Sequence, residues 1–133
     1  MGGEVNLAQV KDLKEGKYVV IDGEPCRIVS IQKSKPGKHG AAKARVEGIS
    51  LFSGNKKTLM KGVDASCEIP VIVRKTAQVV ANLGNNRLQL MDLSTYETYE
   101  LEVEPQYAEL ESGKEVELQD VMGKKMITRV KRS

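Results

Sequence analysis

Apolar and polar residues alternate in short runs along most of the chain, and no stretch keeps the apolar period of a long helix. Alternation of this kind places one face of a strand in a core and the other in water. Strands are therefore expected over residues 18–21, 26–31, 44–52, 57–60, 67–69, 71–73, 78–81, 87–91, 99–104, 115–118 and 125–130. A short helix over 106–112, after Pro105, is the single helix expected.

Turn residues separate these runs. Residues 22–25, Asp-Gly-Glu-Pro, join the first two strands as a hairpin, and residues 84–86, Gly-Asn-Asn, form a turn before 87–91. Many short strands without a long helix are typical of small β-barrels, which leave no open sheet edge. The pattern therefore predicts an all-β protein built from barrels.

A break near Pro70 suggests two domains. Residues 1–70 hold 12 basic and 8 acidic residues, a net charge of +4, whereas 71–133 hold 9 and 10, a net charge of −1. Each part is long enough for one small barrel with a modest core. We expect one domain over 1–70 and a second over 71–133.

Composition narrows the possible functions. The 133 residues are 40% hydrophobic and 29% charged, which is enough apolar material for a core. Aromatic residues make up 4%, with no Trp and one Phe, so a base-stacking surface is disfavoured. A single His argues against a zinc site. Two isolated cysteines, a polar start and the lack of a long apolar run favour a reduced, cytoplasmic protein with no membrane partner.

Positive charge gathers in the first half of the chain. No acid occurs between Glu24 and Glu47, and after Asp120 the chain is basic again. The stretch from Glu97 to Asp120, by contrast, holds nine acids and one base, and it should face away from any bound RNA. The candidate contacts to an RNA backbone are Lys33, Lys35, Lys43 and Arg45. A solvated basic face is the alternative.

One segment differs from the others because it has no large apolar residue. Its members are Ser34, Lys35, Pro36, Gly37, Lys38, His39, Gly40, Ala41, Ala42 and Lys43. Pro36 fixes φ, and Gly37 and Gly40 permit positive φ, so the chain can reverse around Lys38 and His39. Lys38 is expected at the exposed tip of this loop.

From the residues alone, a solvated basic hairpin and a phosphate-contacting loop both remain open. A catalytic Lys38–His39 pair is disfavoured, because no nearby acid would orient the imidazole. His39 is a better loop hydrogen-bonding group than a metal ligand, since no second His or clustered Cys accompanies it. No catalytic residue, metal or enzyme activity is expected.

The decapeptide from Ser34 to Lys43 resembles the modification loop of the archaeal, hypusine-containing translation initiation factor 5A family. Residues 22–26 and 91–93 also resemble segments of that family, whose bacterial counterpart is elongation factor P. The resemblance implies an N-terminal SH3-like barrel and a C-terminal OB-fold. It also implies that deoxyhypusine synthase transfers the aminobutyl group of spermidine to Lys38, giving deoxyhypusine or, after hydroxylation, hypusine.

The same resemblance implies a factor that binds the ribosome near the exit-site tRNA. It would promote peptide-bond formation and relieve stalling, notably at proline runs, with no cofactor beyond the covalent group on Lys38. The alternative is an RNA-binding or chaperone module of SH3/OB type that binds RNA without modification.

Overall fold

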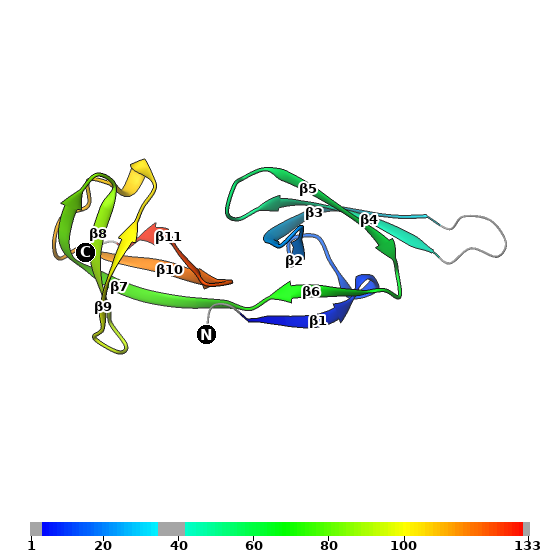
Figure 1. Ribbon diagram of the computed structural model, residues 1–133, viewed down its shortest axis with the longest axis horizontal. Helices are drawn as coiled ribbons and strands as arrows, with labels where there is room; N and C mark the ends of the chain where they lie inside the picture. Colours follow the sequence, from blue (N-terminus) through cyan, green and yellow to red (C-terminus); the bar gives the residue numbers. More distant parts are fainter. Residues whose placement is uncertain (1–3, 35–41, 132–133) are drawn as a thin grey trace. The chain divides into compact units, whose positions relative to one another are not determined.

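A computed structural model describes residues 4–34 and 42–131, and these form strands almost throughout (Figure 1). Internal contacts divide the chain into two units, one of Glu4–Val71 and one that begins at Ile72. The all-β prediction is confirmed, and no helix in the described ranges is long and apolar enough to cross a membrane. Independent folding of the fragments 1–70 and 71–133 stays a prediction.

The first unit is an SH3-like barrel, as predicted. Its elements are β1 (Val5–Gln9), the 3-10 turn η1 (Val10–Asp12), β2 (Tyr18–Ile21), β3 (Glu24–Ser34), β4 (Lys43–Ser50), β5 (Lys56–Gly62) and β6 (Ser66–Pro70). The strands β2, β3, β4 and β5 form an antiparallel meander, and β1 pairs with β6 (Figure 1). Apolar side chains from both sheets and η1 fill one core between them.

The turn between β2 and β3 is shorter than the sequence indicated. Asp22 and Gly23 both have positive φ, 52° and 78°, which is the two-residue turn that suits the twist of a hairpin. Glu24 and Pro25 therefore belong to β3 and pair with Ile21 and Val20. The sequence prediction had placed both in the turn.

Glycine is required inside β4 because two strands approach closely there. A Cβ built on Gly48 would lie 2.9 Å from the Cβ of Cys26 and 3.1 Å from the carbonyl oxygen of Arg27. Gly48 pairs with Ile28 of β3 and Lys57 of β5, so it lies in the middle of the meander. The missing side chain lets β3 and β4 approach closely around Gly48, just before the part of the hairpin that extends toward Ser34 and Lys43.

The strand expected over 44–52 ends at Ser50. The buried Oγ of Ser50 accepts hydrogen bonds from the backbone N–H groups of Phe52 and Ser53, at 3.1 and 3.2 Å, and donates to Glu24 Oε1 at 2.8 Å. Lys57 Nζ lies 2.9 Å from the other oxygen of Glu24, and this lysine lowers the Glu24 pKa. These contacts turn the chain two residues earlier than the apolar run suggests.

The second unit is the predicted OB-fold. It contains β7 (Ile72–Gly84), β8 (Arg87–Asp92), β9 (Thr98–Glu102), the 3-10 turn η2 (Pro105–Tyr107), β10 (Glu115–Val121) and β11 (Lys124–Val130). The strand order is β11-β10-β7-β8-β9, so β10 returns beside β7 after the β7–β8–β9 meander. Alternate residues of these strands close a separate core around Val79, Leu88 and Leu90.

Three expectations for this part of the chain were wrong or incomplete. The strands expected over 71–73 and 78–81 are one strand, β7, which pairs with β10 along its first half and with β8 along its second. The strand over 99–104 ends at Glu102. The helix expected over 106–112 is only the η2 turn, because Asn82 Nδ2 donates to the carbonyls of Ala108 and Leu110, at 2.8 and 2.9 Å.

A buried aspartate organises the turn between β8 and β9. Asp92, 6% exposed, accepts hydrogen bonds on Oδ1 from the backbone N–H groups of Ser94 and Thr95, at 2.7 and 3.2 Å. Its other oxygen lies 3.4 Å from Lys75 Nζ. The Ser94 N–H, followed by Thr95 and Lys75, holds the pKa of this carboxyl below its usual value.

Gly48→Ala is expected to lower the free energy of unfolding by about 1–3 kcal/mol, because a methyl group there overlaps Cys26 and the Arg27 carbonyl. Urea unfolding of the full chain measures the change. Gly62→Ala is the matched control, since a Cβ on that β5 glycine meets only Ala42 O at 3.8 Å. Equal losses for the two variants would contradict the close approach at Gly48.

Asp92→Asn is expected to destabilise the second unit by about 1–2 kcal/mol at pH 7, because it removes a charge that accepts two N–H bonds. A lowered pKa stabilises the fold above the usual value of 3.8 and loses that effect as pH falls through the folded-state value. The difference from wild type should therefore shrink below about pH 4. Near-ultraviolet circular dichroism is suitable, since Tyr96, Tyr99 and Tyr107 all lie in this unit. Glu102→Gln, at an exposed position on β9, should change little at either pH.

Candidate functional site

The candidate site is carried by the long hairpin of β3 and β4 (Figure 1). The register pairs Ser34 with Lys43, Lys33 with Ala44 and Gln32 with Arg45, so both ends of the decapeptide are fixed by strand pairing. Ser34 and Lys43 therefore lie side by side at the end of the ladder. Lys35, Pro36, Gly37, Lys38, His39 and Gly40 lie outside the described residues, and the exposed position of Lys38 stays a prediction.

The base of the hairpin is buried and its end is solvated. Ala44 and Val46 of β4 are 1% and 0% exposed, and Ile28 anchors β3 in the same core. Beyond Ile31 every described residue of β3 is exposed, namely Gln32, Lys33 and Ser34. The core thus holds two strands that extend past it, and the decapeptide begins at their end.

The predicted RNA contacts lie on two opposite faces of the hairpin. Directly paired residues of an antiparallel ladder point to the same side. Arg45 and Lys43 therefore share the outer face of the sheet with Gln32 and Ser34, whereas Lys33 shares the inner side with Ala44. The sequence grouped Lys33, Lys43 and Arg45 without this distinction, and Lys35 lies outside the described residues.

A β-bulge explains why the faces were not apparent from the sequence. The register shifts between Ile28 and Ser30, so Val29 is an extra residue on β3 and is 48% exposed. Counting by twos from buried Ile28 would place Gln32 inside and Lys33 outside. The bulge reverses that assignment.

The structure adds two neighbours that sequence reasoning missed. Lys61 of β5 pairs with Ala44, so it lies on the same side as Lys33, and its Nζ donates to the Ser66 carbonyl at 3.1 Å. Met60 pairs with Arg45 on the outer face and is 65% exposed. Both positions follow from the pairing of β4 with β5, so they could be assigned only once the register of those two strands was known.

The positive charge of the hairpin is only weakly compensated. Glu47, the one acid on β4, is paired with Lys56 Nζ at 2.5 Å, and Lys56, with Arg45 as a weaker contributor, lowers its pKa. Within the described ranges neither Lys33 nor Lys43 forms an ion pair. Two cationic faces without unpaired acids are suited to phosphate groups.

The described residues offer no catalytic or metal-binding set. No group of three His, Cys, Asp or Glu side chains among them is placed to hold a metal ion. Cys26 and Cys67 are free and buried in the first core, and burial raises the pKa of both thiols. A protonated, buried thiol is a poor nucleophile.

Comparisons with known proteins agree along the length of the chain. Residues 5–64 match the family described as Translation initiation factor 5A-like, N-terminal. The chain is 48% identical to translation initiation factor 5A of Metallosphaera sedula, over 96% of this chain and 98% of that protein. It is 52% identical to the protein of the same name from Hyperthermus butylicus, over 96% of this chain and 95% of that protein.

Solved structures give the same result. A eukaryotic translation initiation factor 5A from Methanococcus jannaschii superimposes with a TM-score of 0.84 at 46% identity, covering 98% of both chains. A translation initiation factor eif-5a family protein from Naegleria fowleri gives a TM-score of 0.78 at 28% identity, over 96% of this chain and 99% of that one.

The two faces of the hairpin are expected to contribute separately to RNA binding. Replacing Lys43 and Arg45 together with Ala should reduce the slope of log affinity against log salt by roughly two phosphate contacts. Replacing Lys33 and Lys61 together should produce a similar reduction, because those cations lie on the other side of the ladder. Fluorescence anisotropy with a labelled RNA measures both slopes. If only one of the two double replacements reduced the slope, the RNA contact would be restricted to that face of the hairpin, and if neither did, the hairpin cations would not contact RNA.

Proposed function

The chain belongs to the translation initiation factor 5A family, and we propose that it is a ribosome-binding factor whose Lys38 carries the deoxyhypusine or hypusine group. In this proposal it promotes peptide-bond formation and relieves stalled ribosomes, such as those at proline runs. The family supports a role in translation. The observation that carries the finer proposal is the β3–β4 hairpin, which presents the ends of the decapeptide on a cationic arm.

The chemistry of Lys38 follows from the limits of an ordinary lysine. An unmodified side chain offers one compact cation on a four-carbon stem. Transfer of the aminobutyl group of spermidine to Nζ, in which Nζ loses a proton and the rest of spermidine leaves as 1,3-diaminopropane, lengthens the stem and adds a second amine. The product is a slender double cation that donates hydrogen bonds to phosphates and 2′-hydroxyls. It fits into an RNA crevice that is too narrow for a polypeptide loop.

The proposed effect on peptide-bond formation is positional. Attack on the peptidyl-tRNA ester requires its 3′ end to be oriented, and orientation removes part of the entropic barrier. A side chain held at the end of a core-anchored hairpin provides such a constraint without forming or breaking bonds itself. This role explains how a chain with no catalytic set among its described residues would accelerate a reaction.

Three partners follow from the proposal. The ribosome supplies the RNA cleft, and tRNA supplies the reacting 3′ end. Deoxyhypusine synthase must reach Lys38 before either, and Gly37 and Gly40 permit close approach to the main chain on both sides of that residue. The alternative, an RNA-binding module that needs no modification, would depend on the total charge of the loop rather than on Lys38 alone.

Lys38→Arg distinguishes the modified ribosome-binding factor from the RNA-binding module that needs no modification. Arginine keeps the charge but cannot accept the aminobutyl group, so we expect loss of stalling relief on a proline-run reporter translated in vitro. Thermal stability should stay near that of wild type, because Lys38 is expected to contact no core residue. Intact mass of protein coexpressed with deoxyhypusine synthase verifies the modification state. Full activity of Lys38→Arg would refute the proposal in favour of the unmodified module.

A further inference from the structure

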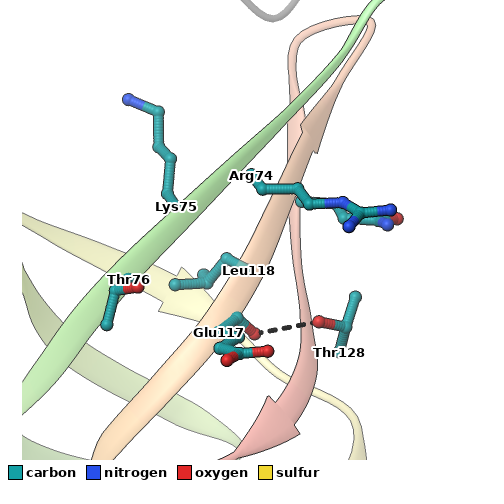
Figure 2. A pocket seen from close by; sticks show the side chains of 7 residues that line it. Arg74, Lys75, Thr76, Glu117, Leu118 and Thr128 are labelled. Atoms are coloured by element: carbon teal, nitrogen blue, oxygen red, sulfur yellow. Dashed lines mark hydrogen bonds between the residues drawn. The ribbon is translucent and has the colours of Figure 1, made fainter.

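A second cationic site lies on the OB-fold, away from the hairpin in sequence. A groove of about 340 Å³ is lined by residues 74–76 of β7, residues 117–119 of β10 and Thr128 of β11 (Figure 2). None of the charged residues in this groove entered the sequence prediction of RNA contacts. The groove is polar, and no aromatic residue lines it.

Strand register places the important side chains on the outer face of the sheet. Arg74 pairs with Gln119, and Thr76 pairs with Glu117, so these four side chains share a face. Lys75 is on the other side of β7, where its Nζ lies 3.4 Å from Asp92, and Figure 2 shows it pointing away from Arg74. Arg74 is therefore the cation that this groove presents.

The acid in the groove is already neutralised. Glu117 Oε1 lies 2.7 Å from Arg129 Nη2, and the Glu117 carbonyl accepts a hydrogen bond from Thr128 Oγ1 at 3.2 Å (Figure 2). Arg74 is exposed and has no ion pair within the part of the chain that the structure describes. The groove thus combines a free guanidinium with an amide and two hydroxyl groups.

The other end of the same sheet is unsuitable for RNA. OB-folds commonly bind oligonucleotides across their second and third strands, which here are β8 and β9. The exposed side chains of β9 include Glu100 and Glu102, and Arg87 of β8 is held by Glu100 at 3.2 Å. With Glu100 engaged by Arg87, that face presents the carboxylate of Glu102, which has no ion pair among the described residues, and no free cation beside it, so it repels a phosphate backbone.

We propose that the Arg74 groove binds the phosphodiester backbone of RNA, as a contact separate from the modification hairpin. The planar guanidinium of Arg74 would pair with phosphate oxygens, while Gln119 and Thr76 would donate to phosphates or 2′-hydroxyls. An acidic protein partner fits less well, because protein interfaces are usually anchored by aromatic side chains in apolar pockets. The choice of RNA rests on the proposed function in translation.

Arg74→Gln in the full-length protein tests the site. Binding of a fluorescein-labelled ribosomal RNA fragment should weaken roughly threefold to tenfold, and the salt slope should fall by about one phosphate contact. Arg87→Gln is the matched control, since it removes the same charge from the same sheet at a position tied to Glu100. It should leave affinity unchanged. Equal losses in the two variants would overturn the site and leave only an effect of net charge.

Glu117→Gln provides the opposite test. It removes the carboxylate from the groove and releases Arg129, so RNA binding should tighten by a similar factor. Unchanged affinity in Arg74→Gln or in Glu117→Gln would overturn the proposal. So would an Arg74→Gln variant that binds ribosomes weakly but free RNA normally, since its partner would then be an acidic protein surface.

These measurements also separate this site from the proposed function. RNA affinity is read directly with protein whose Lys38 is unmodified, so it does not depend on stalling relief. If Arg74→Gln leaves RNA affinity unchanged while Lys38→Arg loses stalling relief, only the proposal of an RNA site in the groove is refuted. If Arg74→Gln weakens RNA binding while Lys38→Arg keeps full stalling relief, the RNA site in the groove is supported and the proposed role of the modification is refuted.

Discussion

The close approach of β3 and β4 at Gly48 is the constraint on which the candidate site depends. No side chain fits between Gly48, Cys26 and the Arg27 carbonyl, so the two strands pack against each other at their base. Ala44 and Val46 continue that packing into the core, after which the hairpin has no apolar support on β3. A rigid base and a solvated end are what a projecting side chain requires, since the base fixes direction and the end avoids burying charge.

The two units differ in how far their cationic side chains are paired with acidic ones. In the SH3-like unit the cations at the end of the hairpin have few acidic neighbours, and the nearest acid on β4 is bound to Lys56. In the OB unit several cations are paired locally, among them Lys75 with Asp92, Lys125 with Asp120 and Arg129 with Glu117. Net charge in a stretch of sequence is therefore a poor guide to binding here, because pairing across strands decides which cations remain available.

The local pattern of apolar and polar residues predicted most strands well, whereas the pairing of strands distant in sequence could not be predicted from it. The apolar run over 18–21 and the alternation over 87–91 located β2 and β8 almost to the residue, and the resemblance of the decapeptide identified the fold of both units. Strand β1 was missed because its residues are mostly exposed and its partner, β6, lies far along the chain. The continuity of β7 was missed because Arg74, Lys75 and Thr76 interrupt its apolar pattern, although β10 pairs with each of them.

The candidate site shows the same limit. Its residue types were evident from the sequence, but the face of Lys33 depends on the bulge at Val29, and the partners of Arg45 depend on the register of β5. Arg74 was not singled out because it is one cation in a segment of balanced charge, and only the ion pair between Glu117 and Arg129 leaves it unopposed. Sequence patterns identify chemistry within a strand, whereas the availability of a charge is set between strands.

The two proposed RNA contacts, if made by one chain, would have a consequence that neither has alone. Once one contact forms, the second becomes an intramolecular event with a raised effective concentration, so overall affinity exceeds that of each part. The groove on the OB-fold would then supply residence on the ribosome, and the modified side chain would be free to bind weakly. Weak binding at the tip is useful there, because a group that orients the 3′ end of a tRNA must also release it after each peptide bond. If the OB-fold groove supplies affinity and the modified side chain supplies positioning, the protein can stay on the ribosome and still release the tRNA end after each peptide bond.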